Sequence, residues 1–229
     1  MSAIIRTENL QKYYNQGEEL EVRALDGVSI EIERGEFTAI VGPSGSGKTT
    51  LLNIVGGLDH QTGGKAFIAD TEITALNDNQ LIDFRLKNIG FVFQAYNLIP
   101  VLTAEENVEF IMLLQNKPKG ERHERAMELL NAVGLADKVN NRPSEMSGGQ
   151  QQRVAVARAL ASKPQFVLAD EPTANLDSQS TADLLDIMAD LNHKEDITFL
   201  FSTHDQRVID RARRVVTLED GKIISDERK

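Results

Sequence analysis

The chain contains no cysteine among its 229 residues. This absence excludes a disulfide framework and any metal site built from thiolates. Long apolar runs are also absent: residues 110–114 form one of the longest, far short of the roughly 20 residues that span a bilayer. Residues 1–6 lack the apolar core of a signal peptide. We therefore expect a soluble, cytoplasmic protein whose contact with any membrane depends on a partner.

Positive charge is scarce relative to negative charge. The chain carries 25 Lys and Arg against 35 Asp and Glu, which gives a formal net charge of −10 and a pI of about 5.0. A nucleic-acid-binding protein needs a broad basic face, so this balance argues against nucleic acid as a partner. Hydrophobic residues at 41% and charged residues at 26% are typical of ordinary globular proteins. The length allows one large domain or two small ones.

A glycine-rich stretch matches the phosphate-loop pattern G-x-x-x-x-G-K-[ST] at every fixed position. Glycines allow the backbone to curl so that successive N–H groups point at phosphate oxygens. The apolar residues 37–41 before the loop predict a buried strand, and residues 49–55 predict a helix. Strand, loop and helix is the context that this motif requires. The residues of the motif are Gly42, Pro43, Ser44, Gly45, Ser46, Gly47, Lys48 and Thr49.

The loop predicts particular roles for two of its side chains. Lys48 has the length to reach the β- and γ-phosphates of a nucleotide, and the Thr49 hydroxyl can bind Mg²⁺. The N-terminus of the following helix adds partial positive charge toward the phosphates. We therefore predict that this stretch binds a nucleotide together with Mg²⁺.

An apolar strand expected at residues 166–169 ends in adjacent carboxylates, Asp170 and Glu171. Downstream of a phosphate loop, this pair suggests that Asp170 holds Mg²⁺ through water and that Glu171 polarises the attacking water. The competing interpretation is a pair of solvated acids in a turn. The buried strand before the pair and Pro172 after it favour the catalytic interpretation.

Three further side chains are ambiguous when each is considered alone. Tyr14 can stack on an adenine ring or pack on a strand end. Gln94 follows an expected strand at residues 89–93, where its amide can contact Mg²⁺ or a water. His204 follows an expected strand at residues 197–201 and can donate to a γ-phosphate, although a single histidine is more often structural. From the local sequence, the structural interpretation is favoured for all three.

A second group of glycines follows Ser147, which is a natural helix N-cap. Gly148 and Gly149 are poor helix formers and cost about 1 kcal/mol each relative to alanine. Bare backbone N–H groups at a helix N-terminus form an anion site, which would account for this cost. An ordinary helix start weakened by glycine explains the same residues equally well.

Periodicity and capping residues predict the remaining elements. Thr103 and Glu106 form a capping box for a helix that extends to about residue 115. Gly134 is expected just beyond the end of the next helix. The other expected elements are strands at residues 4–10 and 65–69, two strands within residues 19–32 broken near Asp26 and Gly27, helices at residues 77–88, 121–133 and 178–191, and a terminal hairpin of residues 214–218 and 222–224.

Taken together, the motifs resemble those of the ATP-binding-cassette (ABC) ATPases, and the resemblance covers nearly the whole chain. Departures from the family pattern are small: Met146 stands where leucine is usual, Thr49 where serine is usual and Ala174 where glycine is usual. The residues that carry the resemblance follow the family's order along the chain: Tyr14, the phosphate loop, Gln94, residues 146–150, Asp170 with Glu171, residues 175–177, and His204.

The resemblance implies an α/β fold, with a RecA-like P-loop NTPase core and a helical subdomain. The core would contain a mostly parallel sheet and a small antiparallel sheet. One ABC ATPase domain would span residues 1–229, with residues 1–94 and 164–229 as the nucleotide-binding core. Residues 95–163 would form the helical subdomain, which carries the signature motif at residues 147–150.

The resemblance also implies ATP and Mg²⁺ as cofactors and assigns roles to individual residues. Catalytic roles fall on Glu171, His204, Gln94 and Lys48. Mg²⁺ ligation falls on Thr49, Gln94 and Asp170. Contacts with ATP fall on Tyr14, Gly42, Pro43, Ser44, Gly45, Ser46, Gly47, Lys48, Thr49, Thr50, Ser147, Gly148, Gly149, Gln150 and Asp177.

In this family two subunits sandwich two ATP molecules head to tail, and each ATP lies between the phosphate loop of one subunit and the signature motif of the other. A homodimer in the ATP-bound state is therefore expected, which would explain two anion sites in one chain. More narrowly, the chain looks like the ATPase subunits of macrolide-export and lipoprotein-releasing systems. Those subunits power a separate integral membrane permease, so we expect this chain on the inner face of the cell membrane, bound through its permease.

Residues 95–102 are strongly apolar for a segment between a sheet and a capped helix. Loops are normally polar and exposed, and an exposed apolar groove often marks a partner surface. The segment is therefore expected to receive a short permease helix, and Gln94 would link it to the nucleotide. The alternative is that Leu98, Ile99 and Leu102 fill the core of the helical subdomain.

Two other functions are compatible with parts of the sequence. The first is a non-transport ABC ATPase that acts with a membrane partner in cell division or envelope assembly. The second is a nucleic-acid-handling ATPase of the same family, which is disfavoured because the chain has no heptad run and holds only one cassette. A GTPase is disfavoured because no Asn-Lys-x-Asp motif occurs.

Overall fold

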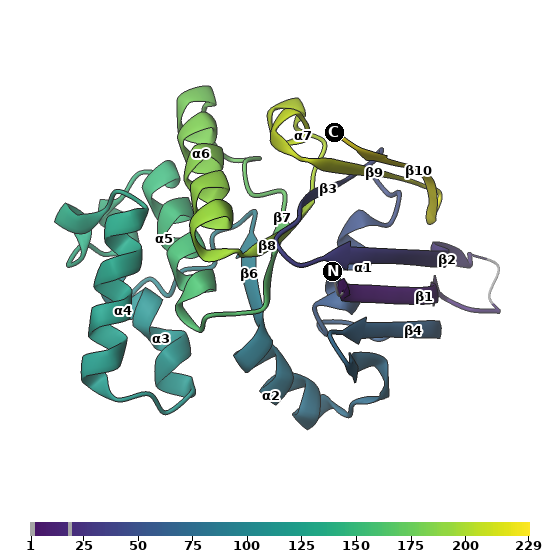
Figure 1. The fold of residues 1–229 in the computed structure, drawn as a ribbon, viewed down its shortest axis with the longest axis horizontal. Helices are drawn as coiled ribbons and strands as arrows, with labels where there is room; N and C mark the ends of the chain where they lie inside the picture. The colour runs from purple at the N-terminus through teal and green to yellow at the C-terminus, as the bar shows by residue number, and fades with distance from the viewer. Residues whose placement is uncertain (1–2, 18–19) are drawn as a thin grey trace.

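The computed structural model describes residues 3–17 and 20–229 and contains two β-sheets flanked by helices (Figure 1). The smaller sheet is antiparallel, with strand order β2-β1-β4-β5. Its strands are β1 (Ala3–Tyr14), β2 (Val22–Glu33), β4 (Gly63–Ile68) and β5 (Thr71–Glu72).

The larger sheet has six strands in the order β10-β9-β3-β8-β7-β6. All neighbouring strands in it are parallel except β9 and β10, which form the predicted terminal hairpin. A mostly parallel sheet beside a small antiparallel one confirms the predicted α/β architecture. The strands of the larger sheet are β3 (Phe37–Val41), β6 (Ile89–Phe93), β7 (Phe166–Asp170), β8 (Thr198–Ser202), β9 (Arg214–Glu219) and β10 (Lys222–Arg228).

The central strands of the large sheet are buried on both faces, which explains their unbroken apolar sequences. Alternate residues of β8 belong to different cores: Phe199 and Phe201 face one, and Leu200 faces the other. The Phe37 ring packs against the Phe201 ring, with centroids 4.6 Å apart. One core lies toward the long helices and the other toward the antiparallel sheet, so the large sheet separates the two cores.

Two helices belong to the side that carries the antiparallel sheet. The helix α1 (Lys48–Val55) follows the glycine-rich loop and buries Leu51, Leu52, Ile54 and Val55 in the second core. The helix α2 (Asp78–Asn88) leads into β6, after short 3₁₀ turn η1 (Ile73–Ala75). Asn77 caps α2 through a capping box with Gln80.

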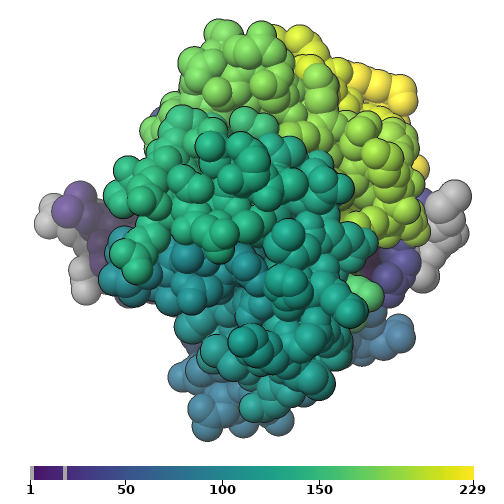
Figure 2. All heavy atoms as spheres, turned by 90° about the vertical axis from the view of Figure 1, so that its left-hand side faces the viewer, coloured from purple at the N-terminus to yellow at the C-terminus, as the bar shows by residue number. Residues whose placement is uncertain are grey.

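The helices α3 (Ala104–Leu114), α4 (Lys119–Ala132) and α5 (Gly148–Ala161) pack together at one end of the molecule, as Figure 2 shows in teal and green. Short turns η2 (Ala136–Lys138) and η3 (Pro143–Glu145) connect α4 to α5. The helices α6 (Ser178–Glu195) and α7 (Gln206–Arg211) complete the fold. The first core runs without interruption from α3 and α4 through α5 and α6 to the large sheet.

The helix ends predicted at Thr103, Gly134 and Ser147 are confirmed, whereas α4 begins two residues earlier and α6 ends four residues later than predicted. The Thr103 hydroxyl accepts the Glu106 N–H, and the Glu106 carboxylate accepts the Thr103 N–H, as a capping box requires. Gly134 follows the C-cap of α4 with φ of 71°. Ser147 is the N-cap of α5. These caps fix where α3, α4 and α5 begin or end, and so where the loops between them emerge.

The prediction of two strands within residues 19–32 is wrong, because β2 runs without a break through Asp26 and Gly27. Gly27 has φ of +86° and is the extra residue of a bulge, since Leu10 pairs with Val28 and Gln11 with Asp26. The expected start at Glu19 lies outside the described residues. The first strand is also longer than predicted and includes Tyr14.

Within the residues that the structure describes, no helix has the combined length and apolarity needed to cross a membrane. The longest helix, α6, has 18 residues and a charged, partly exposed surface.

Candidate active site

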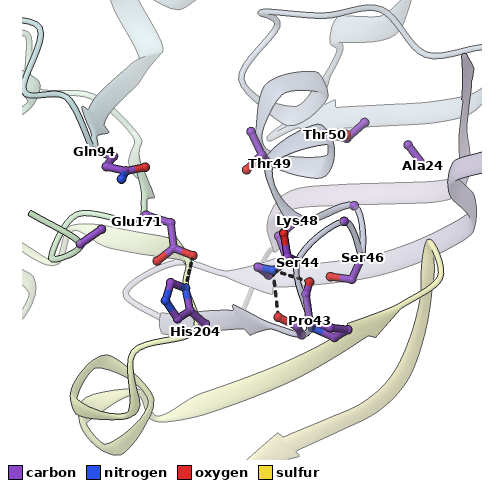
Figure 3. Close-up of a pocket in the computed structure, with 14 residues that line it drawn as sticks. Ala24, Pro43, Ser44, Ser46, Lys48, Thr49, Thr50, Gln94, Glu171 and His204 are labelled. Atoms are coloured by element: carbon purple, nitrogen blue, oxygen red, sulfur yellow. Dashed lines mark hydrogen bonds and ion pairs between the residues drawn. The ribbon is translucent and has the colours of Figure 1, made fainter.

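A cavity of about 520 Å³ lies above the glycine-rich loop and is lined by residues from several separate segments. Figure 3 shows Gln94, Glu171 and His204 on one side of it and the loop with Lys48 on the other. The volume is suitable for a small-molecule ligand. The lining residues are Ala24, residues 42–50, Gln94, Glu171, Ala174 and His204.

The loop between β3 and α1 has a conformation that only glycine tolerates at two positions. Gly42 has φ of +150°, and a Cβ there would lie 2.0 Å from the Leu218 carbonyl oxygen. Gly47 has φ of +103°, and a Cβ there would lie 2.1 Å from the Ala24 carbonyl oxygen. Backbone carbonyl oxygens of other segments therefore lie against the loop at both positions and leave no room for a side chain, which explains the motif's glycines in physical terms.

The start of α1 presents unpaired backbone donors to the cavity. The Leu51 N–H donates to the Gly47 carbonyl, which is the first hydrogen bond of the helix. The N–H groups before it belong to the first turn, where a helix has no internal acceptor for them. Donors of this kind, together with the helix dipole, bind phosphate oxygens. The glycine-rich loop and the start of α1 therefore fit a nucleotide phosphate chain.

Lys48 is buried, and its ammonium group currently binds the loop itself (Figure 3). Its Nζ donates to the carbonyl oxygens of Gly42 and Pro43, both at 2.9 Å. No carboxylate within the described residues forms an ion pair with it. An ammonium group held only by carbonyl dipoles can exchange them for phosphate oxygens, which carry full negative charge.

The oxygens of Thr49 and Asp170 meet at the edge of the cavity. Thr49 Oγ1 donates to Asp170 Oδ1 at 3.1 Å, although the two residues belong to α1 and β7. Gln94, at the end of the neighbouring strand β6, lines the same cavity. Hydroxyl, carboxylate and amide oxygens are the donor set that Mg²⁺ prefers, so the residues predicted for the metal fit it chemically.

Glu171 and His204 form the wall opposite the loop. His204 Nδ1 lies 2.7 Å from Glu171 Oε1, and the Thr203 hydroxyl donates to Glu171 Oε2 at 3.4 Å. Glu171 has φ of +45°, which is costly for a residue with a side chain, and its N–H donates to the Ser202 carbonyl. A strained backbone held by a neighbouring strand is a common feature of functional positions.

The segment after His204 anchors this wall. Asp205 accepts hydrogen bonds from the Arg207 guanidinium and from the Thr173 hydroxyl, which lowers the pKa of its carboxyl group to about 2. Thr173 follows Glu171 by two residues, so the bond joins the two loops that carry Glu171 and His204. At neutral pH the carboxylate is therefore ionised, and it joins these two loops.

Tyr14 does not line the cavity, but it lies at the end of β1 near a residue that does. It pairs with Val22, and a register shift between Lys12 and Tyr13 leaves the cavity residue Ala24 as an extra residue of β2, two positions after Val22. Tyr14 and Val22 are 41% and 54% exposed, and the Tyr14 hydroxyl donates to Asp59. An exposed aromatic and apolar surface beside a phosphate site suits a planar base.

The signature residues and Asp177 form a second group that does not line the cavity. Ser147 Oγ accepts the Gln150 N–H at the start of α5, and a side chain at Gly149 would meet Ser180. Asp177 accepts hydrogen bonds from the Ser180 N–H and hydroxyl, which lower the pKa of its carboxyl group. The structure therefore divides the predicted site residues into a phosphate-loop group and a signature group.

Two residues of α5 that sequence reasoning missed connect these groups. The Gln152 amide is fully buried and donates to the carbonyls of Phe93 and Pro172, which adjoin Gln94 and Glu171. The Arg158 guanidinium donates to the carbonyls of Tyr96 and Asn97. Gln152 is identifiable in hindsight as a polar residue on the buried face of α5, at helical spacing from Gly149 and Ala159.

The strand-loop-helix phosphate cradle and the two carboxylates at the end of β7 define a P-loop nucleotide hydrolase. Comparison with known proteins identifies the family. The profile of the family described as ABC transporter matches residues 25–174, so the chain belongs to the ABC transporter family. It is an ATPase of this family.

Curated relatives and solved structures agree with this assignment. The chain is 47% identical to an uncharacterized ABC transporter ATP-binding protein of Thermotoga maritima, over all of this chain and 97% of the relative. It is 46% identical to lipoprotein-releasing system ATP-binding protein LolD 1 of Rhodopseudomonas palustris, over 97% of this chain and 99% of the relative. It is also 46% identical to macrolide export ATP-binding/permease protein MacB of Brucella melitensis, over 99% of this chain but only 35% of that relative.

The fold matches the ATP-binding cassette MJ0796 with a TM-score of 0.89 and 42% identity, over 98% of each chain. Those structures are described as dimeric, and one is described as a post-hydrolysis state bound to ADP and phosphate.

Proposed function

We propose that the chain is the ATP-hydrolysing subunit of a transporter in which a separate integral membrane permease carries out the transport step. Similarity to LolD over nearly the full length of both chains, and to about a third of the length of MacB, supports lipoprotein release or macrolide and peptide efflux as the class of work. In this role the chain attaches to the inner face of the cell membrane through its permease. The core of residues 1–94 and 164–229 holds the nucleotide, and the helical subdomain of residues 95–163 responds to it.

The chemistry follows from the residues around the cavity. ATP lies with its phosphates on the loop at residues 42–50, and Thr49, Gln94 and Asp170 would hold Mg²⁺. The ion would supply positive charge beside the phosphate oxygens. Glu171 orients and polarises the attacking water, and His204 contacts the γ-phosphate from the same wall.

ATP binding brings two copies of the chain together head to tail. At the start of α5 the signature residues carry the exposed Ser147 hydroxyl and the first-turn N–H groups of Gly148 and Gly149, away from their own cavity. A second copy supplies these donors to the γ-phosphate held by the first. The description of MJ0796 as dimeric supports the pairing of two copies. Asp177 lies beside the signature residues and so adjoins the same interface.

The observation that carries the assignment to a permease is an apolar groove of about 340 Å³, here called the β6–α3 groove. It lies where the edge strand β6 meets α3, and the segment after Gln94 forms part of its wall. Leu114 in this groove and its neighbour Leu113 are each about half exposed. The lining residues are Ile89, Gly90, Phe91, Phe93, Asn97, Ile99, Phe110, Ile111, Leu114, Arg158, Ala159 and Ser162.

The groove refines the expectation for residues 95–102. Leu98 packs against the core, as the alternative interpretation holds, whereas Ile99 lines the groove. The Tyr96 hydroxyl donates to the Asn175 carbonyl and so points toward the signature group. An amphipathic permease helix in the groove would therefore contact Ile99 and Leu114. Its docking would be coupled to Gln94 through the backbone between Gln94 and Ile99.

Ile99→Asp is expected to weaken docking of the permease by about tenfold or more, the size of effect seen when an interface anchor is lost. The reason is that a carboxylate would be buried against apolar groove atoms. The measurement is ATPase activity of the purified chain alone and with its reconstituted permease. Activity of the chain alone should persist, whereas stimulation by the permease should require a higher permease concentration.

Val101→Asp is the matched control, because Val101 is 70% exposed, lies two residues from Ile99 and does not line the groove. Cysteine at Ile99 or Leu114, in a chain that has none, should form cross-links to the permease in native membranes. Equal effects of both aspartate variants, or no cross-link from either position, would place the docking surface elsewhere.

Tyr14→Ala is expected to raise the KM for ATP and for GTP alike and to leave the kcat at saturation nearly unchanged. The loss corresponds to about 1–3 kcal/mol of base stacking, which depends weakly on the identity of the base. Tyr14→Phe keeps the ring and removes only the hydrogen bond to Asp59, so its KM should stay near the original value. Tyr13→Ala is the second control, because Tyr13 bonds to Asp26; an effect there and none at Tyr14 would refute the assignment.

A further inference from the structure

Arg158 places a positive charge in the β6–α3 groove without a negative partner. It is the one charged side chain among the residues that line the groove. Its guanidinium donates to the carbonyl oxygens of Tyr96, at 2.8 Å, and Asn97. Over residues 3–17 and 20–229, no carboxylate oxygen lies within ion-pair distance of it. In a chain with a net charge of −10, an unneutralised cation at this position is unexpected.

The two arginines that are buried among the described residues lie in ion pairs. Arg125 pairs with Glu128 and Glu195, and Arg214 pairs with Glu36 and Asp226. These carboxylates more than offset burial, so the pKa of each guanidinium is raised. Burial alone acts on Arg158 and lowers the pKa of its guanidinium. The fold therefore supplies counter-charges for Arg125 and Arg214, whereas Arg158, the charged residue of the groove, donates to backbone carbonyls only.

The geometry leaves Arg158 able to accept a carboxylate from outside. A guanidinium has five N–H donors, and the bonds to Tyr96 and Asn97 occupy two nitrogens through one donor each. Phe93, Ile99 and Leu114 contribute apolar surface to the other parts of the groove. An acidic side chain entering there would meet an oriented cation in apolar surroundings, where a charge-assisted hydrogen bond is strong and specific.

We propose that the β6–α3 groove recognises an amphipathic helix that carries an Asp or Glu on its apolar face, and that Arg158 is the residue that binds this carboxylate. The proposal rests on the proposed function, because the helix is the docking segment of the permease, and it adds the chemistry that selects the partner. Charge complementarity decides the occupant: a purely apolar helix would leave Arg158 buried and unpaired, and a basic one would be repelled.

Docking of this kind would also act on the nucleotide site. Tyr96 and Asn97 both have positive φ, 53° and 51°, and Arg158 holds their carbonyls in that conformation. Gln94 lies two residues earlier, and its carbonyl accepts the Asn175 side-chain amide. A carboxylate that draws the guanidinium toward itself would therefore shift the segment that carries Gln94.

The test uses two synthetic amphipathic helical peptides on the full chain. The peptides carry the same Leu and Phe anchors and differ only in Glu or Gln at one position on the apolar face. Their Kd values are measured by fluorescence anisotropy at low and at high NaCl. The Glu peptide should bind at least about fivefold more tightly at low salt, and the preference should shrink as salt rises.

Three variants identify the side chain responsible for the preference. Arg158→Gln should reduce the Glu-to-Gln preference to about one, and Arg158→Lys should retain part of it. Arg153→Gln is the matched control, because Arg153 lies on the same helix but donates to the Val133 carbonyl outside the groove. Its preference should equal that of the original chain.

The outcomes separate this inference from the proposed function. Binding of both peptides with less than about a fivefold preference in the original chain would overturn the recognition of a carboxylate while preserving the groove as a docking site. A preference that persists in Arg158→Gln would overturn the role of Arg158. Failure of both peptides to bind would overturn the groove as a docking surface, and the inference with it. The comparison in the original chain requires no variant, so it stands even if Arg158→Gln does not fold.

Discussion

Replacement of Glu171 by Gln is expected to slow ATP hydrolysis by roughly 10²–10⁴-fold, which is the usual contribution of a general base. Gln has the shape of Glu and can still bond to His204, but it cannot accept a proton from water or polarise it to the same degree. Residues that hold the phosphates are untouched, so ATP should bind normally. The variant should therefore accumulate as an ATP-bound dimer.

The measurements are steady-state phosphate release, ATP affinity by equilibrium binding, and mass by size-exclusion chromatography with ATP. Lys48→Ala provides the contrast, because it removes the ammonium group that we expect to bind the phosphates and should abolish binding itself. Glu72→Gln is the matched control for a lost carboxylate, since Glu72 pairs with Lys65 on β4 and lies outside the cavity. Near-normal turnover of the Glu171 variant would refute its role as the base.

The sequence was sufficient to predict those parts of the site that depend on local chemistry. A phosphate loop requires glycine where backbone atoms of other segments leave no room for a side chain, and Gly42 and Gly47 occupy such positions. Capping boxes are equally local, so Thr103 was predictable as the start of α3. Buried strands such as β3 and β8 were predictable from their apolar runs, whereas the fold class followed from the family resemblance that the motifs carry.

Features that depend on distant segments were not predictable. The β6–α3 groove exists only because residues 89–93, 99 and 110–114 meet, and no local pattern reports that meeting. Gln152 and Arg158 act on backbone carbonyls of other segments, which leave no trace in the sequence of those segments. The bulge at Gly27 also depends on its partner strand, so the local sequence suggested a break instead.

The phosphate-loop group and the signature group are separate in the structure, so neither group alone forms a complete active site. Within one chain the signature group lies outside the cavity, and the donors at the start of α5 have no phosphate to bind. The link between the groups runs through α5, from Ser147 at its start to Gln152, which holds the carbonyls beside Gln94 and Glu171. A partner that engages Ser147 would therefore act on both catalytic loops of this chain.

If the active site is shared between two subunits, mixed Ser147→Arg and Lys48→Ala proteins should regain ATPase activity that neither has alone. A heterodimer would contain one site in which both defects meet and one in which the phosphate loop and the signature group are both intact. Random pairing makes half of the dimers mixed, so about a quarter of the original rate is the upper bound if one intact site suffices. Activity should also rise faster than linearly with protein concentration.

Loss of helix capping must be separated from loss of the shared site, because Ser147 Oγ also caps α5. Asn77→Arg is the matched control: it removes the N-cap of another capping box, on α2 and outside the cavity, with a similar cost of about 0.5–2 kcal/mol in stability. That variant should keep its activity and should not complement Lys48→Ala beyond its own rate. Recovery in the Ser147 and Lys48 mixture, with none expected from either parent, would demonstrate that each nucleotide contacts two chains. A linear dependence of rate on concentration, from a protein that stays monomeric with ATP, would contradict the shared site.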